Sequence, residues 1–216
     1  MPHSHLDAGW LKSYDEYYFD DVYAIFSSVV NKMLYDTEVT YTVGDLAFFQ
    51  RYYENIANFE QRQVANLVKR GQLEIVHGGL VSPDEACPNY SDVLRNFEAG
   101  HDFVKQAFGV IPTVAWQLDP FGHSSAFADL FAEIGFDATV FARMNIEDKQ
   151  SRRLERDLEF VWQPDFYEET EPSLRKEVFA HTLYDHYSPG VVPHSFLTGE
   201  GALRLDQADY FNTAWS

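Results

Sequence analysis

Apolar side chains follow two spacings along this chain, and the two spacings alternate. Recurrence at three and four residues is typical of helices with one buried face and predicts helices at residues 11–34, 45–53, 59–70, 91–108 and 127–134. Short apolar and β-branched runs predict strands at residues 39–43, 73–77, 113–118, 137–143, 158–162 and 178–183. Residues 145–156 are charged and weakly patterned, so we expect a connection there.

Strands that alternate with helices predict an α/β fold with a parallel sheet, either open or closed as a barrel. No low-complexity segment or convincing linker interrupts the pattern, although residues 189–216 are irregular and glycine-rich. We therefore expect a single domain over residues 1–216. Asp45 follows a predicted strand and is expected to cap the next helix.

Composition narrows the classes of function. The net charge of -18 argues against nucleic acid as a partner, because phosphates require a basic face. No apolar run reaches the roughly 18 residues that a membrane span requires. Cys87 is the single cysteine, which excludes an intrachain disulfide and makes a thiolate metal site a poor hypothesis. We expect no signal peptide before the first motif, because Met1 lies two residues ahead of it. The 16% aromatic content beside many carboxylates suits a sugar site.

Two stretches carry the main candidate chemistry. His5 and Asp7 are two residues apart, so on an extended segment both side chains point to one side, and this pair suits zinc. Trp10 could form an aromatic wall, but a flexible, solvated end is the alternative for this stretch. Asp119 ends the predicted strand at 113–118, where the loops of a β/α protein converge, although a helix cap or turn is its alternative role.

Several further residues have a functional and an ordinary interpretation. His123 could support a carboxylate, and Asp84 and Glu85 could hold the site together, or all three could be solvated loop residues. Arg143 follows a strand and could neutralise nearby carboxylates, with a surface salt bridge as the alternative.

Two histidines and the exit of the last predicted strand are treated in the same way. Tyr184 and Asp185 end this strand and could line a pocket or form a surface loop. His77 with its two following glycines could approach a ligand or make a turn, and His101 on an apolar helical face is better explained as a packed side chain. Together, the candidates lie at the exits of successive strands and therefore on one face.

Three segments in this order resemble the retaining class II α-mannosidases, namely His3–Lys12, Gly78–Ala86 with its Pro-Asp-Glu-Ala ending, and Trp116–Ser124. The run from Phe131 to Lys149 is similar to the lysosomal branch of that family. The resemblance covers residues 3 to about 165 and thins beyond. It implies a seven-stranded, barrel-like parallel β/α catalytic domain, incomplete at both ends of this chain. It also implies one bound zinc ion and removal of terminal α-linked mannose from oligosaccharides and N-glycans.

The resemblance also implies roles for individual residues. His5, Asp7 and Asp119 would be zinc ligands, and Asp119 would also be the nucleophile of a retaining mechanism. Trp10 would stack near the sugar, and Arg143 would sit beside the nucleophile.

A family pair that contacts the sugar matches Tyr184 and Asp185, but Tyr187 and Ser188 offer a competing alignment. His123, Asp84 and Glu85 would support the site without touching the sugar.

The sequence departs from the family in ways that matter. Leu80 stands where the family usually has tryptophan, which would relax packing near the site. The resemblance places the acid/base aspartate and the remaining zinc-binding histidine beyond Ser216. We therefore expect a fragment whose partners are the rest of the mannosidase polypeptide and mannose-containing glycoproteins. Alone, it would be poorly stable and nearly inactive.

Two other functions stay open at this point. An inactive or non-catalytic carbohydrate-binding remnant would fit the short length. A metal-dependent carbohydrate deacetylase would also place His/Asp pairs at strand ends, although the Asp119–His123 stretch does not belong to that class. The resemblance implies a lysosome-like compartment, and the oligomeric state is left open.

Overall fold

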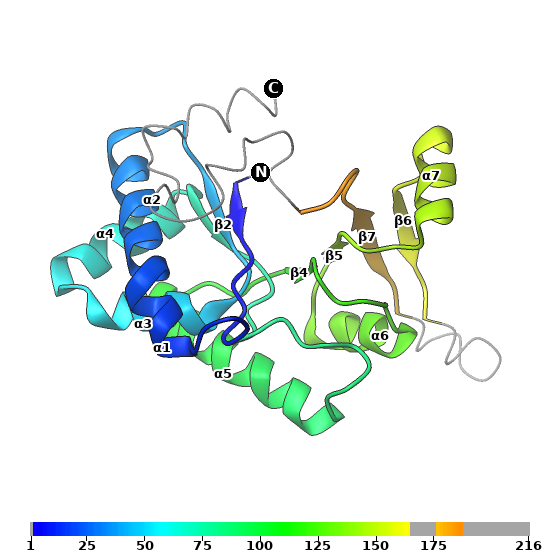
Figure 1. Cartoon of the computed structure of the whole chain (residues 1–216), viewed down its shortest axis with the longest axis horizontal. Helices are drawn as coiled ribbons and strands as arrows, with labels where there is room; N and C mark the ends of the chain where they lie inside the picture. The colour runs from blue at the N-terminus through cyan, green and yellow to red at the C-terminus, as the bar shows by residue number, and fades with distance from the viewer. Residues whose placement is uncertain (1, 165–175, 188–216) are drawn as a thin grey trace.

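The computed structural model describes residues 2–164 and 176–187 (Figure 1). These residues form two sheets. The first has the order β1-β2-β3 and consists of β1 (His3–Ser4), β2 (Tyr41–Val43) and β3 (Leu73–Ile75). The second has the order β4-β5-β7-β6 and consists of β4 (Val114–Gln117), β5 (Ala138–Phe141), β6 (Glu159–Trp162) and β7 (Val178–Thr182).

Neighbouring strands are parallel except for the last pair. Thr42 of β2 lies opposite His3 of β1 and Glu74 of β3, and β5 pairs in the same direction with β4 and β7. β6 pairs antiparallel with β7. The predicted α/β fold with parallel sheets is confirmed. A closed seven-stranded barrel is not, because β1 and β6 lie at outer edges of these sheets within the described residues.

His77 joins the two sheets. Its backbone N–H donates to the carbonyl of Val114 at 2.6 Å, and its ring Nδ1 accepts the N–H of Trp116 at 3.0 Å. The residue adopts the left-handed conformation with φ of 62° and is fully buried. One imidazole thus occupies the place of a backbone acceptor between β3 and β4.

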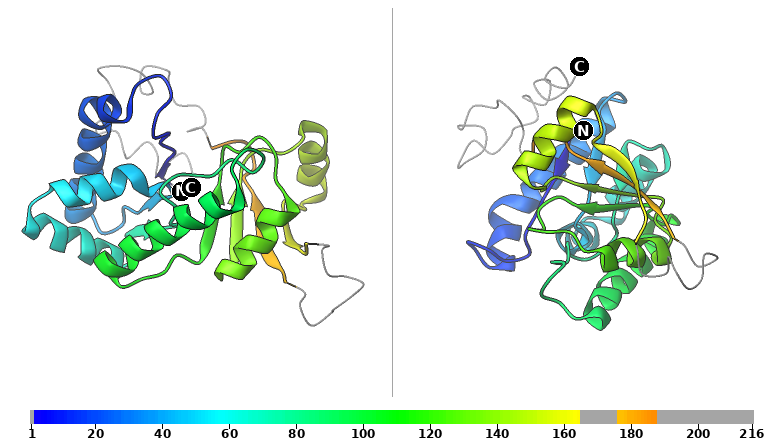
Figure 2. Two further views of the ribbon diagram at one scale, coloured as in Figure 1. Left: turned by 90° about the horizontal axis from the view of Figure 1, so that it is seen from below. Right: turned by 90° about the vertical axis from the view of Figure 1, so that its right-hand side faces the viewer.

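Helices precede or follow the strands, as the pattern predicted. They are α1 (Tyr14–Tyr17), the π-helical turn η1 (Tyr18–Val22), α2 (Tyr23–Tyr35), α3 (Leu46–Asn55), α4 (Asn58–Lys69), α5 (Tyr90–Phe108), α6 (Ser125–Ile134) and α7 (Ile146–Glu155). Figure 2 shows α2, α3 and α4 at one end of the molecule and α7 at the other, with the strands between them. No helix in residues 2–164 and 176–187 is long and apolar enough to cross a membrane.

The expectation of a connection at residues 145–156 was wrong, because this segment is α7. Asn145 caps it by accepting the N–H groups of Glu147 and Asp148 at 2.9 and 3.1 Å. The helix buries Lys149 and no apolar residue, so its sequence lacks the periodic apolar face by which a helix is predicted.

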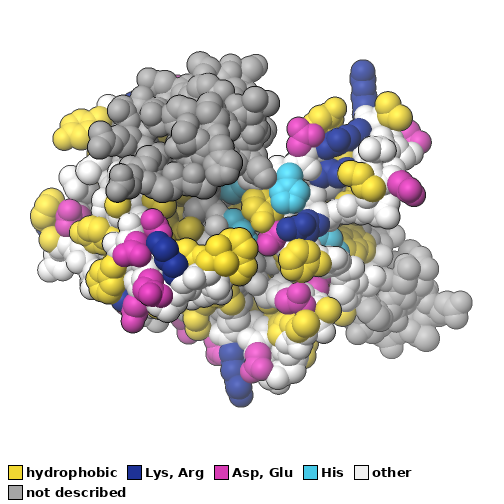
Figure 3. All heavy atoms as spheres, in the orientation of Figure 1, with side chains coloured by type: hydrophobic (Ala, Val, Ile, Leu, Met, Phe, Trp, Pro, Cys, Tyr) yellow, Lys and Arg dark blue, Asp and Glu magenta, His cyan; other side chains and the backbone are white. Residues whose placement is uncertain are grey.

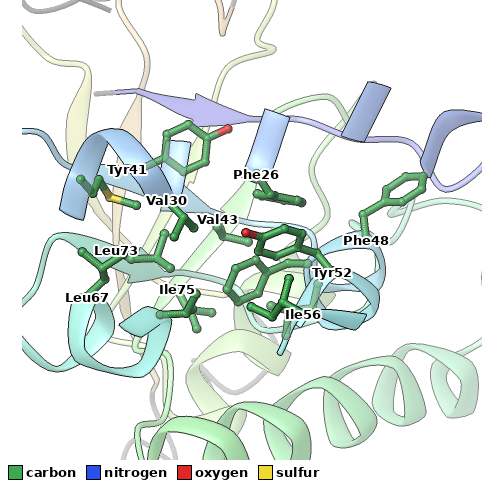
Figure 4. Packing of buried hydrophobic residues seen from close by; sticks show 14 of the residues in the cluster. Phe26, Val30, Tyr41, Val43, Phe48, Tyr52, Ile56, Leu67, Leu73 and Ile75 are labelled. Atoms are coloured by element: carbon green, nitrogen blue, oxygen red, sulfur yellow. The ribbon is translucent and has the colours of Figure 1, made fainter. Parts of the chain in front are cut away.

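The largest core cluster lies between the first sheet and helices α2, α3 and α4. Figure 4 shows Phe26, Tyr52 and Val43 packed with Leu73 and Ile75 from the neighbouring strand. A second cluster around Phe97, Phe131 and Phe136 packs against β4 at Ala115. This packing fixes the strands whose ends carry the candidate site.

Candidate active site

Polar side chains meet beyond the carboxyl ends of the parallel strands. His5 and Asp7 follow β1, Asp45 follows β2, Asp119 follows β4 and Arg143 follows β5. Parallel strands bring such positions to one edge of a sheet. In Figure 3, histidine side chains gather near the centre of this view, beside acidic and basic groups.

His5, Asp7 and Asp119 converge. The His5 Nε2 atom lies 3.5 Å from Asp7 Oδ1 and 3.7 Å from Asp119 Oδ2. All three residues line a cavity of about 200 Å³. The two aspartates, 112 positions apart in the chain, therefore face the same cavity.

The donor atoms of this group, an imidazole nitrogen and carboxylate oxygens, are of the kinds that bind a zinc ion. Both ring nitrogens of His5 are buried and have no hydrogen-bond partner. Two ligand atoms that bind one zinc ion tetrahedrally lie about 3.3 Å apart, close to the separations around His5 Nε2. No group of three or more His, Cys, Asp or Glu side chains in residues 2–164 and 176–187 is arranged to hold a metal ion as it stands. Relative to that spacing, His5 Nε2 lies about 0.2 Å too far from Asp7 Oδ1 and about 0.4 Å too far from Asp119 Oδ2.

Asp119 is held by a cation and by a hydroxyl. The Nε of Arg143 donates to Asp119 Oδ1 at 2.7 Å and the second guanidinium nitrogen donates to the same oxygen. The hydroxyl of Tyr187 also interacts with this carboxylate. Burial acts to raise the pKa of Asp119, but the hydrogen bonds from Tyr187 and Arg143 and the charge of Arg143 outweigh it and leave the pKa below its ordinary value.

Tyr187 is part of this site although Tyr184 was the residue predicted to line it. Burial, followed by the bond to Asp119, raises the pKa of Tyr187 to about 12, so the hydroxyl keeps its proton. Its ring also lies 5.1 Å from the ring of His5. The competing alignment in the sequence had pointed to this residue.

Asp45 is a site residue that sequence reasoning missed. It was predicted to cap α3, but its side chain makes no capping bond. Instead, Oδ2 faces His5 Nδ1 at 3.6 Å and accepts the Leu6 N–H at 3.3 Å, while Oδ1 accepts the Ser82 hydroxyl at 2.6 Å. Burial raises the pKa of Asp45, and the charge of His5 and these bonds act against that rise. The signal that could have found it is the one used for Asp119, an aspartate directly after a strand.

Glu85 and His123 hold the loop that follows Asp119. Glu85 accepts the Ser124 N–H at 2.7 Å and the Gln117 amide at 3.2 Å, and its Oε1 lies 3.0 Å from His123 Nδ1. Gln117 and Ser124 flank Asp119 on both sides, so one carboxylate fixes the strand end and the helix start. Asp84 lines the cavity and accepts two backbone N–H groups of its own turn.

Three predicted substrate residues are not brought into this group. Trp10 is 73% exposed and is not among the residues that line the cavity. Tyr184 and Asp185 bind Arg153 of α7 instead, through the Tyr184 carbonyl and the Asp185 carboxylate. His101 is a packed side chain, as predicted, with Nε2 at 2.9 Å from the His77 carbonyl.

A parallel α/β sheet whose carboxyl edge gathers a histidine, carboxylates and an arginine around a cavity has the architecture of an α/β enzyme domain. The Glycosyl hydrolases family 38 N-terminal domain matches residues 1–213. The chain belongs to this family.

Curated relatives agree with this assignment, and a solved structure shares the fold. The chain is 38% identical to an alpha-mannosidase of Arabidopsis thaliana over 198 residues, which are 88% of this chain and 19% of that protein. It is 35% identical to the lysosomal alpha-mannosidase of Mus musculus over 88% of this chain and 19% of that protein. The crystal structure of an alpha-mannosidase from Enterococcus faecalis V583 has the same fold, with a TM-score of 0.70 at 18% identity over 98% of this chain and 22% of that chain. The chain thus spans about a fifth of the length of these curated relatives.

Proposed function

We propose that this chain contributes the nucleophile and part of the zinc site of a retaining exo-α-mannosidase. The convergence of His5, Asp7 and Asp119 on one cavity is the observation that carries the proposal. The names of its relatives, alpha-mannosidases, supply the substrate class, α-linked mannose. A sugar hydroxyl can bond the carboxylates that line this cavity.

Asp119 would attack the anomeric carbon of the bound mannose. A nucleophilic carboxylate has to be ionised, and the Arg143 and Tyr187 contacts favour that form. A retaining glycosidase needs a second carboxyl group roughly 5 Å away to protonate the leaving oxygen. The resemblance places that acid, and one further histidine ligand, outside these 216 residues.

His5 Nε2, Asp7 Oδ1 and Asp119 Oδ2 would hold the zinc ion. When bound, zinc supplies charge and a template that orients vicinal sugar hydroxyls. Two arrangements also belong to the proposal. One is a barrel-like closure of the sheets in the whole catalytic domain, and the other is a lysosome-like location, which the names of the lysosomal relatives support.

Substitution of the proposed nucleophile tests this function in the complete polypeptide that carries the chain. Asp119→Asn should lower kcat/KM for a mannoside by on the order of a thousandfold or more, because the attacking carboxylate is lost. Zinc should fall below one ion per protein in the same variant, measured by metal analysis. Asp20→Asn is the matched control, because that carboxylate is exposed and paired with Lys12.

The products decide between the competing functions. Release of mannose with retained configuration supports the mannosidase. Release of acetate from an acetylated sugar would point to a deacetylase. Sugar binding without turnover by the complete wild-type protein would point to a non-catalytic domain and overturn the proposal.

A further inference from the structure

Lys149 is a buried cation that the proposed reaction does not use. It lies on α7 and is 4% exposed. Its Nζ donates to two backbone carbonyls, those of Ala142 at 2.8 Å and Asp185 at 2.5 Å. Burying an ammonium group costs free energy unless strong partners compensate it, so such a residue is costly for a surface helix to keep.

Each carbonyl belongs to a segment that carries a side chain in contact with Asp119. Ala142 directly precedes Arg143, whose guanidinium donates to the Asp119 carboxylate. Asp185 lies two residues before Tyr187, whose hydroxyl interacts with that same carboxylate. Lys149 therefore bridges the exits of β5 and β7, at positions one residue before Arg143 and two residues before Tyr187.

A second cation on α7 holds the β7 exit. Arg153 donates through Nε to the Tyr184 carbonyl at 2.6 Å and through a second nitrogen to the Asp185 carboxylate at 2.7 Å. Its guanidinium carbon also lies 4.5 Å from the centre of the Tyr184 ring. Up to this point the strands stay paired, because the Leu183 N–H donates to the Phe141 carbonyl at 2.9 Å. Beyond Leu183, side chains of α7 supply the hydrogen bonds that hold this segment in place of the neighbouring strand.

We propose that Lys149 is a positioning residue that sets the spacing between the β5 and β7 exits, so that Arg143 and Tyr187 reach the Asp119 carboxylate together. This inference rests on the proposed role of Asp119 as the nucleophile. An ammonium group suits the task because it can donate to two carbonyls in different directions. A shift of about 1 Å in a residue that aligns a reacting group can cost on the order of a hundredfold in rate.

Three variants of the complete polypeptide that carries this chain test the proposal. Lys149→Met removes the donor and keeps the length, and Lys149→Arg restores a donor. Arg152→Met is the matched control, because Arg152 is a cation of the same helix whose bonds run to Asp148 and Asp157 and not to the strand exits. Thermal unfolding of each variant reports any general loss of stability.

Hydrogen exchange measures directly how firmly Lys149 holds the β7 exit and does not depend on any reaction. In Lys149→Met, the backbone amides of residues 183–187 should exchange at least about tenfold faster than in the wild type, because the segment loses its anchor. The rate should stay near the wild-type value in Arg152→Met and should return towards it in Lys149→Arg.

Turnover measures the consequence for chemistry. In Lys149→Met, kcat should fall by about 10- to 100-fold with KM within about threefold of wild type, since alignment of the nucleophile and not sugar binding is lost. Lys149→Arg should recover most of this loss. A purely structural role would instead lower the unfolding temperature and leave the kcat of the folded enzyme unchanged.

Three results would overturn the proposal. They are unchanged exchange of residues 183–187 in Lys149→Met, faster exchange with unchanged kcat, and equal effects of Lys149→Met and Arg152→Met. If the wild type itself releases no mannose, the proposed function fails. The exchange rates then still decide whether Lys149 holds the two strand exits.

Discussion

At the scale of single residues, the contacts of the Asp119 carboxylate explain its lowered pKa, which an aspartate does not have by itself. Arg143 and Tyr187 both bind its carboxylate, while its other side faces His5. The rule that residues at strand exits share one face was sufficient to predict His5, Asp7 and Asp119 as neighbours. The same rule was not applied to Asp45, because an aspartate before a helix is usually a cap. Whether a carboxylate caps a helix or faces a histidine depends on a residue 40 positions away, which local pattern does not contain.

In the proposed zinc site, Asp45 should affect the affinity for the ion through His5. Asp45 Oδ2 lies 3.6 Å from the second ring nitrogen, where its charge favours the tautomer that presents Nε2 to a metal, and loss of such a partner typically costs 10- to 100-fold in affinity. Asp45→Asn is therefore expected to weaken zinc binding by about that factor, measured by competition with a fluorescent chelator. The Ser82→Ala variant removes the bond to Asp45 Oδ1 alone and should have the smaller effect. Equal zinc affinities in wild type and Asp45→Asn would show that His5 needs no such partner.

At the scale of elements, apolar spacing predicted the helices and strands that bury apolar faces. It missed α7, because that helix buries a lysine and is held by polar bonds. It also could not predict that β6 runs antiparallel to β7, because direction depends on a connection rather than on the strand itself. Long-range contacts between elements decide such features, and two of them are open to direct tests.

The contact between α5 and the turn after β3 depends on Gly100. A Cβ atom at this position would lie 2.0 Å from the Gly78 carbonyl oxygen, and backbone cannot give way as a side chain can. Gly100→Ala should therefore lower the free energy of unfolding by about 1 to 3 kcal/mol, despite the higher helix propensity of alanine. Denaturant unfolding measures the change. Gly9→Ala, where nothing lies within 4 Å, is the control and should change stability by less than about 0.5 kcal/mol.

The seam between the sheets should be sensitive to acid through His77. Burial lowers its pKa from 6.5 to about 3, so between these pH values His77 is neutral in the folded state and protonated in the unfolded state. The contribution of His77 to stability is complete above pH 6.5 and is lost as the pH falls towards 3, by about 1.4 kcal/mol per pH unit.

A non-titrating substitution isolates this contribution. Asparagine tolerates positive φ and can place an acceptor near the position of Nδ1. His77→Asn should still be less stable than wild type at pH 7, because the buried imidazole is lost. The difference in unfolding free energy between the two proteins should shrink as the pH falls from 6.5 to 4.5, because only the wild type loses the contribution of a neutral His77. A difference that stays constant over this range would contradict a neutral, buried His77.

At the scale of the whole molecule, 34 acidic residues against 16 basic ones dominate the electrostatics. Family membership and fold class could be predicted from the sequence, because the motifs are ordered along most of the chain. Closure of the sheets could not, since it depends on contacts between distant edges. The net charge of -18 nonetheless permits one prediction for the molecule as a unit.

Salt should stabilise this chain at neutral pH. Repulsion among excess carboxylates opposes the compact state, and ions shorten its range from about 30 Å at 0.01 M to about 3 Å at 1 M. Raising sodium chloride from about 0.01 to 0.5 M at pH 7 should raise Tm by about 2 to 4 °C, measured by calorimetry. Near pH 4.6, the isoelectric point, the same addition should have little effect. A salt effect of equal size at both pH values would rule out net charge as its cause.

Sheets usually tolerate exchange of their side chains, because backbone atoms carry the bonds between strands. Where β3 meets β4 that independence is lost, since an imidazole nitrogen supplies one of these bonds. The identity of residue 77 thus decides whether the Trp116 N–H has an acceptor at this junction, while the bond from the backbone N–H of residue 77 to the Val114 carbonyl is independent of the side chain. Chimeras that recombine this chain with a relative should therefore inherit position 77 and the strand opposite it from the same parent.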